Sequence, residues 1–446
     1  MALSGLEIFK LLPKTNCKKC GFPTCLAFAM QLAAKKVSLD KCPDVSEESK
    51  AALDGASAPP IKLVTIGNTD KKVAVGNETV LFRHEETFYH QPGIAIRLKD
   101  NLTNNEIMEK LEVIKKLSFE RVGLILEPNL IALEDVSGTP NQYADKVKLI
   151  SENINYPLVL ISESPEVIDA ALKIIKDKKP LICGANSNNY EGMTKLAKES
   201  ECPLVVKANN LEELDELVSK VTKLGVNDLI LDPGGRDLRT TLNNLTLLRR
   251  LALKKGYRQL GYPIITFPSN TDEMLQPAEV SIYIAKYAGI VVTDAYQPWQ
   301  ILPLVTGRQD IYTDPRKPLQ AESKVYEIGA VDRNSPVLVT TNFSLTYFTI
   351  AGEIEACKVP AYLFLVNTEG TSVLTAWAAD KFTSETITKT LEKLKVADLV
   401  DHRTLIIPGL VSIISGKLQE ESGWKVQVGP KEASGIAAFL RDWKAA

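Results

Sequence analysis

The segment PLVLISESPEVIDAALKIIKDKKPLICGA, residues 157–185, decides the fold of the central part of this 446-residue chain. An apolar run at 157–162 is followed by residues 165–177, whose apolar positions recur at helical spacing, and then by a second apolar run at 180–185. A strand, a helix and a strand joined by short turns are typical of a parallel β/α unit.

The same unit recurs on both sides of this segment. Helices are predicted between the apolar runs, for example at 105–117 and 211–224. No G-x-G-x-x-G follows the first run, so a TIM (β/α)8 barrel over residues 93–312 is favoured over a dinucleotide-binding sheet. The eight predicted strands are 93–98, 122–127, 157–162, 180–185, 203–208, 228–233, 263–268 and 289–294.

The carboxyl ends of these strands are where a barrel places its chemistry. Polar residues and glycines stand there, although ordinary strand-to-loop turns explain them at least as well. Cys183 and Cys202 flank strands and are expected to be small core residues, as is Cys357 further on. The candidates are Glu127, Glu163, Asn186, Lys207, Asp232, Gly234, Gly235, Ser269, Asn270 and Asp294.

Before the barrel, four of the seven cysteines fall in a short N-terminal segment, with the spacing C-x2-C-x4-C-x16-C. A second C-x2-C pair, usual for zinc, is missing, and the last cysteine precedes a proline, so a [4Fe-4S] cluster is favoured over zinc or unliganded thiols. The predicted ligands are Cys17, Cys20, Cys25 and Cys42, with an amphipathic helix over 25–36 shielding one side.

This cluster domain is predicted to span residues 1–57. Residues 43–60 are rich in Pro, Ser, Ala and acidic residues and predict a linker. Residues 58–92 are assigned to the end of this linker and to a small antiparallel meander, because short apolar runs alternate there with Gly-Asn turns.

The last third, residues 325–446, again alternates strands and helices. Its apolar runs at 337–342, 361–367, 402–409 and 424–430 predict an open doubly wound sheet of the flavodoxin type. Such sheets bind ligands at the carboxyl ends of their strands. Small hydroxyl, amide and glycine residues stand there, which suit a large ligand bearing many amides and are equally common in plain turns. The candidate residues at these ends, of which all but Val373, Pro430 and Ala433 are of these types, are Thr340, Thr341, Asn342, Gly370, Thr371, Ser372, Val373, Gly409, Gly429, Pro430 and Ala433.

Composition excludes several classes of function. Lys plus Arg is 53 and Asp plus Glu is 55, so the net charge is -2 and no electrostatic footprint for nucleic acid is present. No apolar run is long enough for a transmembrane helix. Glu7 and Lys10 interrupt the apolar N-terminus, which argues against a signal peptide and for a cytoplasmic protein.

Taken together, the motif CKKCGFPTCLAFA with Cys42, the barrel and the C-terminal α/β domain resemble the large (gamma) subunit family of the corrinoid iron–sulfur protein of the reductive acetyl-CoA (Wood–Ljungdahl) pathway. The resemblance covers the full chain. It implies an α/β multidomain protein with a small [4Fe-4S] domain, a TIM barrel and a corrinoid-binding domain. It also implies that Cys17, Cys20, Cys25 and Cys42 hold the cluster.

The resemblance further implies a methyl carrier, a corrinoid-dependent methyltransferase component. Its cobalt corrinoid (cobamide), as cob(I)amide, accepts a methyl group from methyltetrahydrofolate through a separate methyltransferase and donates it to the nickel cluster of carbon monoxide dehydrogenase/acetyl-CoA synthase. The cluster returns accidentally oxidised Co(II) to Co(I). A small (delta) subunit is the expected heterodimer partner. The implied corrinoid contacts are Thr340, Thr346, Gly370, Thr371, Ser372, Val373 and residues near Gly429 to Ala433.

Many corrinoid domains place a cobalt ligand in D-x-H-x-x-G, and here that motif is absent. Around His402 the corresponding positions are Val400 and Leu405, so His402 is expected to be a surface or turn residue. Without a basic lower ligand, reduction of the cobalt is easier.

Two other functions remain open from the residues. One is a TIM-barrel enzyme that acts directly on a pterin-like substrate, with the cluster supplying electrons. The other is a plain electron-transfer subunit, which would not need two further β/α domains.

Overall fold

The computed structural model describes residues 5–33, 37, 39–46, 49, 59–121 and 123–444. Two compact units are present: Met1–Leu117 with Glu127–Tyr312, and Ser118–Leu126 with Thr313–Ala446. Most of the predicted 43–60 linker lies outside the described residues.

The N-terminal segment forms two short packed helices, α1 (Gly5–Leu11) and α2 (Cys25–Ala33), and a 3-10 turn at Leu39–Lys41. The predicted helix over 25–36 is therefore present as far as Ala33, and residues 34–36 lie outside the described part. Ile8, Leu12 and Phe28 form a small apolar cluster between these elements.

The central sheet is an eight-stranded barrel in which all neighbours are parallel. The strand order follows the chain, the last strand pairs with the first, and a parallel bridge between Leu231 and Ile264 closes the remaining seam. The strands are β3 (Gly93–Lys99), β6 (Leu130–Glu134), β7 (Leu158–Ile161), β8 (Leu181–Ala185), β9 (Leu204–Lys207), β10 (Leu229–Asp232), β11 (Ile265–Thr266) and β12 (Ile290–Thr293). The predicted TIM barrel is confirmed.

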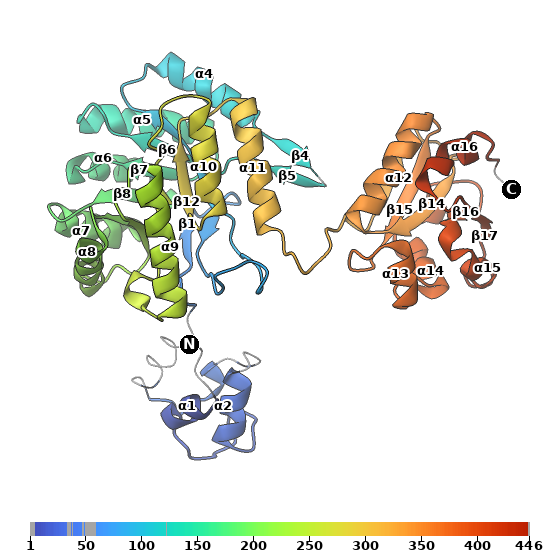
Figure 1. Ribbon diagram of the computed structural model, residues 1–446, viewed down its shortest axis with the longest axis horizontal. Helices are drawn as coiled ribbons and strands as arrows, with labels where there is room; N and C mark the ends of the chain where they lie inside the picture. The colour runs from blue at the N-terminus through green and yellow to red at the C-terminus, as the bar shows by residue number, and fades with distance from the viewer. Residues whose placement is uncertain are drawn as a thin grey trace. The chain divides into compact units, whose positions relative to one another are not determined.

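A helix follows each barrel strand, and these helices surround the sheet (Figure 1). Their apolar stripes face the strands; in the sixth of the eight, for instance, Thr241, Leu245, Leu248 and Ala252 are buried. The helices are α4 (Asn104–Lys115), α5 (Pro140–Asn153), α6 (Pro165–Ile175), α7 (Tyr190–Ser200), α8 (Leu211–Lys223), α9 (Leu238–Lys254), α10 (Leu275–Ala285) and α11 (Pro298–Tyr312).

One predicted barrel strand was wrong. The described residues of the run 122–127, which begin at Gly123, do not enter the barrel: β5 (Leu124–Leu126) pairs antiparallel with β4 (Phe119–Arg121) as a hairpin that groups with the C-terminal unit. The second barrel strand is β6, which follows the break at Pro128. Leu124 and Ile125 are exposed, which an apolar run alone does not reveal.

The predicted meander is only partly present. β1 (Val64–Ile66) and β2 (Val73–Val75) form one antiparallel pair, and residues 79–90 hold no strand. The pair shares a core with inward-facing barrel residues such as Ala95 and Leu130. Gly67 donates its N–H to the carbonyl of Lys179, just before β8, so the pair covers the amino-terminal end of the barrel.

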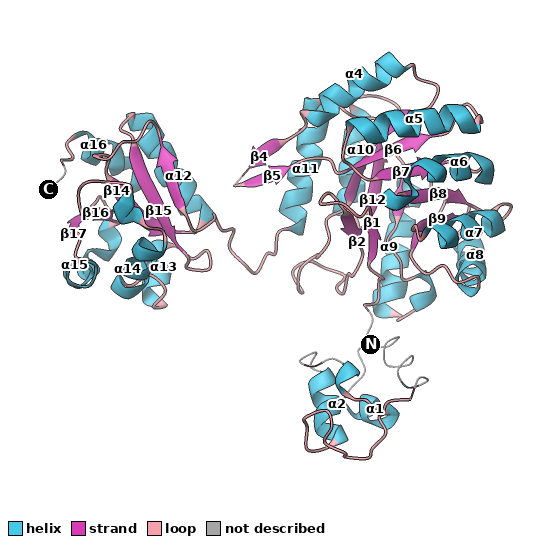
Figure 2. Ribbon diagram, turned by 180° about the vertical axis from the view of Figure 1, so that it is seen from behind, coloured by secondary structure: helices cyan, strands magenta, loops and turns pink. Residues whose placement is uncertain are grey.

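The C-terminal unit contains a five-stranded sheet in the order β13-β15-β14-β16-β17 (Figure 2). Only β13 is antiparallel, and the remaining order is that of a flavodoxin-type sheet, as predicted. The strands are β13 (Val325–Ile328), β14 (Val337–Thr341), β15 (Ala361–Val366), β16 (Thr404–Ile407) and β17 (Lys425–Val428).

Helices cover both faces of this sheet. Alternation along β14 divides the core: Val337 and Val339 face one side, and Leu338 faces the other. The first face packs on α13 (Val373–Ala378), α14 (Ser384–Lys393) and α15 (Ser415–Ser422), and the second on α12 (Ser344–Cys357) and α16 (Ile436–Arg441).

Candidate functional site

The loop that carries the first three cysteines has an unusual backbone. Lys14, Asn16 and Lys18 all have positive φ, at 57°, 49° and 62°, and Gly21 has φ 84°. Left-handed residues this closely spaced are rare outside glycine and make this backbone unusual. The Asn16 side chain accepts a hydrogen bond from the Cys25 N–H at 2.8 Å, so the start of α2 is tied back to this loop.

The four predicted ligand cysteines are all free thiols in this segment. Cys25 and Cys42 are buried in the apolar cluster, Cys20 packs against it, and Cys17 is half-buried. Burial, together with charge on the other three thiols, raises the pKa of Cys42. As these side chains stand, no three His, Cys, Asp or Glu residues of the described part form a ready-made metal site.

The donor set nevertheless fits an iron–sulfur cluster. Three of the four thiols lie in or against one apolar cluster, those of Cys20, Cys25 and Cys42. Lys19, between two of the cysteines, pairs with Asp44 at 3.1 Å, which ties the loop to the chain beyond Cys42. Thiolate ligands in a mainly apolar shell are what a [4Fe-4S] group requires.

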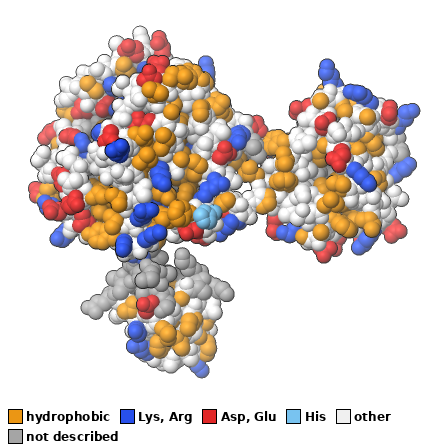
Figure 3. Space-filling model, in the orientation of Figure 1, with side chains coloured by type: hydrophobic (Ala, Val, Ile, Leu, Met, Phe, Trp, Pro, Cys, Tyr) orange, Lys and Arg blue, Asp and Glu red, His pale blue; other side chains and the backbone are white. Residues whose placement is uncertain are grey.

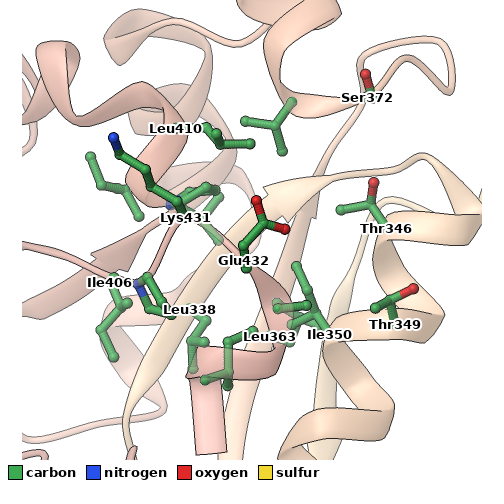
Figure 4. A pocket seen from close by; sticks show the side chains of 18 of the residues that line it. Leu338, Thr346, Thr349, Ile350, Leu363, Ser372, Ile406, Leu410, Lys431 and Glu432 are labelled. Carbon is green, nitrogen blue, oxygen red and sulfur yellow. The ribbon is translucent and has the colours of Figure 1, made fainter. Parts of the chain in front are cut away.

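The second candidate site is a cavity of about 300 Å³ in the C-terminal unit (Figure 4). It lies at the carboxyl ends of β14 and β16, between which the strand order reverses. Ligands of doubly wound sheets bind at this point. Its floor is apolar, with Leu338, Leu363 and Ile406 from three adjacent strands.

Six of the predicted cofactor contacts line this cavity. They come from three separate segments, the start of α12, the start of α13 and the loop after β17. They are Thr346, Ser372, Val373, Gly429, Pro430 and Ala433.

The other six predicted contacts do not line the cavity and stay predictions as ligand contacts. The Asn342 amide is buried, and its Oδ1 accepts hydrogen bonds from the N–H groups of Thr368 and Gly370. Thr371 donates its hydroxyl to the Thr368 carbonyl at 2.8 Å. Gly409 donates its N–H to the Pro430 carbonyl at 3.1 Å. Each of these residues thus supports a loop that lines the cavity.

Thr340 and Thr341 remain without a polar partner. Both side chains are fully buried, and neither hydroxyl has a hydrogen-bond partner among the described residues; the Ser344 hydroxyl is in the same condition. They lie at or just beyond the end of the strand whose Leu338 and Val339 line the cavity. Buried hydroxyls without a hydrogen-bond partner are uncommon, and these three add unused hydrogen-bonding capacity at this edge of the sheet.

Sequence reasoning missed part of the lining. Leu345, Thr349 and Ile350 lie on the face of α12 toward the cavity, and their i, i+4, i+5 spacing was a usable signal. Lys431 and Glu432 also line the cavity, between the predicted Pro430 and Ala433. These two charged residues differ from the neutral rim that the sequence predicted.

His402 lies away from this cavity. It precedes β16, so it stands at the amino end of the sheet, where its Nε2 lies 2.9 Å from the Ser335 carbonyl oxygen and its Nδ1 accepts from the Thr404 N–H. The prediction of a turn residue agrees with these contacts.

The barrel mouth presents paired side chains. Asp294 accepts two hydrogen bonds from Arg97, both at 2.7 Å, and buried Asp232 binds Arg236 at 2.7 Å. Lys207 pairs with Glu163 at 2.6 Å. These mouth residues therefore satisfy one another.

The remaining barrel candidates have structural partners too. The N–H groups of Ser269 and Asn270 donate to Glu279. Glu127 is misplaced by the prediction, because it follows the hairpin rather than a barrel strand and pairs with Lys71 of the β1–β2 turn. Asn186 N–H donates to the Asn189 side chain, while Gly234 and Gly235 lie against the backbone of neighbouring segments.

Cys183, Cys202 and Cys357 are buried, as expected for core residues. Burial raises the pKa of the Cys183 and Cys202 thiols. No helix in the described part of the chain is long and apolar enough to cross a membrane. On the face shown in Figure 3, acidic and basic side chains are intermingled.

Comparison with known proteins gives matches over nearly the whole chain. The family model described as CO dehydrogenase/acetyl-CoA synthase delta subunit matches residues 63–440, and an Fe-S cluster model matches residues 12–43. The corrinoid/iron-sulfur protein large subunit of Moorella thermoacetica is 48% identical, covering 99% of each chain. The acetyl-CoA decarbonylase/synthase complex subunit gamma of Methanothermobacter thermautotrophicus is 36% identical, also covering 99% of each chain.

Among solved structures, a dihydropteroate synthase from Thermus thermophilus is 16% identical with a TM-score of 0.40, covering 56% of this chain and 100% of that chain. The family model carries the delta name, whereas the relatives that align from end to end, cysteine segment included, carry the large or gamma name. The end-to-end matches decide the assignment: the chain belongs to the family of corrinoid/iron-sulfur protein large subunits.

Proposed function

We propose that this chain is the large subunit of a methyl carrier, with a cobalt corrinoid at the C-terminal cavity and a [4Fe-4S] cluster on Cys17, Cys20, Cys25 and Cys42. Bound there, the corrinoid would supply the methyl-carrying chemistry between methyltetrahydrofolate, with a separate methyltransferase, and the nickel cluster of CO dehydrogenase/acetyl-CoA synthase. The [4Fe-4S] cluster would supply the electron that restores Co(I). The name of the Moorella thermoacetica relative, a corrinoid/iron-sulfur protein, supports both cofactors, and the Fe-S cluster model over residues 12–43 supports the second.

The observation that carries the proposal is the cavity at the reversal point of the C-terminal sheet. A volume of about 300 Å³ is at the lower end of the range for sites that enclose a drug-sized ligand. A corrinoid is larger than such a ligand, so the cavity takes only an apolar part of it. The remainder faces the rim, where hydroxyls of Thr346 and Ser372 are available to its amides.

The lining is suited to holding a cofactor rather than to proton transfer. Its charged groups are Lys431 and Glu432, both exposed on the rim, and the remaining lining residues do not titrate near neutral pH. The described residues of the C-terminal unit contain one histidine, His402, at the opposite edge of the sheet. No histidine in the described part of this unit would therefore be available at the cavity as a cobalt ligand, and the identity of such ligands tunes the reduction potential of a bound metal.

The rim also fits a protein partner. Leu345, Leu374, Leu410 and Ile413 are exposed apolar side chains on three elements around the cavity. Exposed apolar side chains gathered around a ligand site are typical of a surface that another chain covers. We assign this surface to the small (delta) subunit of the proposed heterodimer.

A tryptophan placed in the cavity tests the proposal. Thr346→Trp fills the mouth from α12, while Glu355→Trp adds the same side chain to an exposed position on the same helix and serves as the control. We expect Thr346→Trp to lose the visible absorption of bound corrinoid while Glu355→Trp keeps it, with similar thermal unfolding of both. Full corrinoid binding by Thr346→Trp would place the corrinoid elsewhere.

A further inference from the structure

The connection that follows α11 leads into the C-terminal unit. Its segment 319–321 is hydrogen bonded to the turn that begins α12: the Ala321 N–H donates to the Asn342 carbonyl at 2.9 Å, and the Ser344 N–H donates to the Leu319 carbonyl at 3.0 Å. An antiparallel bridge joins Gln320 and Phe343. This short piece of the connection is therefore part of the C-terminal unit.

The Asn342 side chain joins this piece to the neighbouring loop. Its Nδ2 donates to Gln320 Oε1 at 3.2 Å and to Asn367 Oδ1 at 3.3 Å. Its Oδ1 accepts the N–H of Thr368 at 2.9 Å and that of Gly370 at 3.0 Å. With 2% of its surface exposed, this one amide is committed to protein partners on both sides.

Packing also holds residues 318–320 against the loop 367–373. Gly370 has φ 73°, and a Cβ placed on it would lie 2.7 Å from Gln320 Cγ and 3.0 Å from the Pro318 carbonyl oxygen. The loop therefore rests on residues 318–320 with no room for a methyl group. Two and three residues later the same loop supplies Ser372 and Val373 to the cavity wall.

We propose that Asn342 and Gln320 are positioning residues that hold the loop 367–373 in its ligand-binding form. Loss of either side chain should therefore weaken corrinoid binding, an inference that rests on the proposed function for its ligand and on hydrogen bonds and packing for its mechanism.

Hydrogen exchange of the full-length chain tests the mechanism without a ligand. Gln320→Ala removes one bond to Asn342 and the support under Gly370, whereas Lys317→Ala changes an exposed residue of the same connection. We expect the Thr368 and Gly370 amides to exchange about three- to tenfold faster in Gln320→Ala, the effect of one typical hydrogen bond, and to be unchanged in Lys317→Ala. Unchanged exchange in Gln320→Ala would overturn the inference.

Titration with hydroxocobalamin then tests the link to binding. Gln320→Ala should raise its Kd about three- to tenfold. Asn342→Ala should weaken binding further, because it also removes the acceptor for the Thr368 and Gly370 N–H groups. Equal Kd values for wild type, Gln320→Ala and Asn342→Ala would overturn the inference, whereas a wild-type chain that binds no corrinoid would instead overturn the proposed function.

Discussion

Replacing Gly409 by alanine should displace the loop 429–431, which forms one wall of the cavity. Gly409 follows β16 and its N–H binds the Pro430 carbonyl. A Cβ at this position would lie 2.5 Å from the Gly429 carbonyl oxygen, 2.8 Å from Pro430 C and 2.9 Å from Lys431 N. All three atoms belong to the backbone of the loop that forms one cavity wall, so no flexible side chain can move aside.

The size of the effect follows from these distances. Ordinary van der Waals contact begins at 3.4 Å, so the loop backbone must retreat by about 1 Å. Forcing extra volume into a packed site costs about 1–3 kcal/mol. If that cost is borne by the ligand-binding conformation, corrinoid affinity falls about five- to hundredfold.

Gly416→Ala is the matched control. Gly416 lies in α15 of the same unit with nothing within 4 Å of its added Cβ, and alanine is the better helix former by about 0.5–1 kcal/mol. The assay is titration of the full-length chain with hydroxocobalamin, followed by absorbance, beside thermal unfolding. Binding by Gly409→Ala as tight as that of Gly416→Ala would refute the assignment of the loop 429–431 to the binding site.

Three further predictions follow from other parts of the chain. Cys25→Ser should lose most of its iron while cobalt is retained, and Cys202→Ala, a buried thiol of the barrel unit, should keep both; metal analysis of the two variants decides. Arg249→Ala should lower the free energy of unfolding by about 3–5 kcal/mol. It removes the cation paired with buried Glu78, which keeps hydrogen bonds from the N–H groups of Tyr89 and His90, and it removes the stacking on Phe88 and Tyr287. Urea unfolding measures this, with the exposed Lys389→Ala within about 0.5 kcal/mol of wild type. Burial acts to raise the pKa of Asp294, but the hydrogen bond and charge of Arg97 outweigh it, and the pKa is lowered. The ion pair therefore stabilises the fold fully above about pH 5 and loses its effect as the pH falls through the lowered pKa, so wild type should lose more stability than Arg97→Ala between about pH 5 and pH 2.

The barrel was predictable because its units repeat a local pattern. Seven of the eight predicted runs coincide with barrel strands, since each buried parallel strand is an apolar run bounded by turns. The failure at 122–127 has a physical cause: an exposed hairpin strand and a buried barrel strand of three to five residues have the same local composition. The two kinds of strand differ in their burial, and burial depends on the tertiary structure.

The cavity was predictable in position and less so in detail. Parallel strands bring their carboxyl ends together, so strand ends such as Gly429 and the residues just after them, such as Ser372, were found from the pattern. Whether an individual residue faces the cavity or supports a loop from behind depends on packing, as Asn342 and Gly409 illustrate. The part played by the connection at 319–321 pairs residues more than 20 positions apart, and local sequence carries no signal for it.

Joint iron and cobalt analysis of the purified full-length chain with its partner subunit tests the central claim most directly. A methyl carrier of this kind should contain iron and cobalt in a ratio of about four to one, with the cobalt bound as a corrinoid. An active protein replete in iron and free of cobalt would contradict the account.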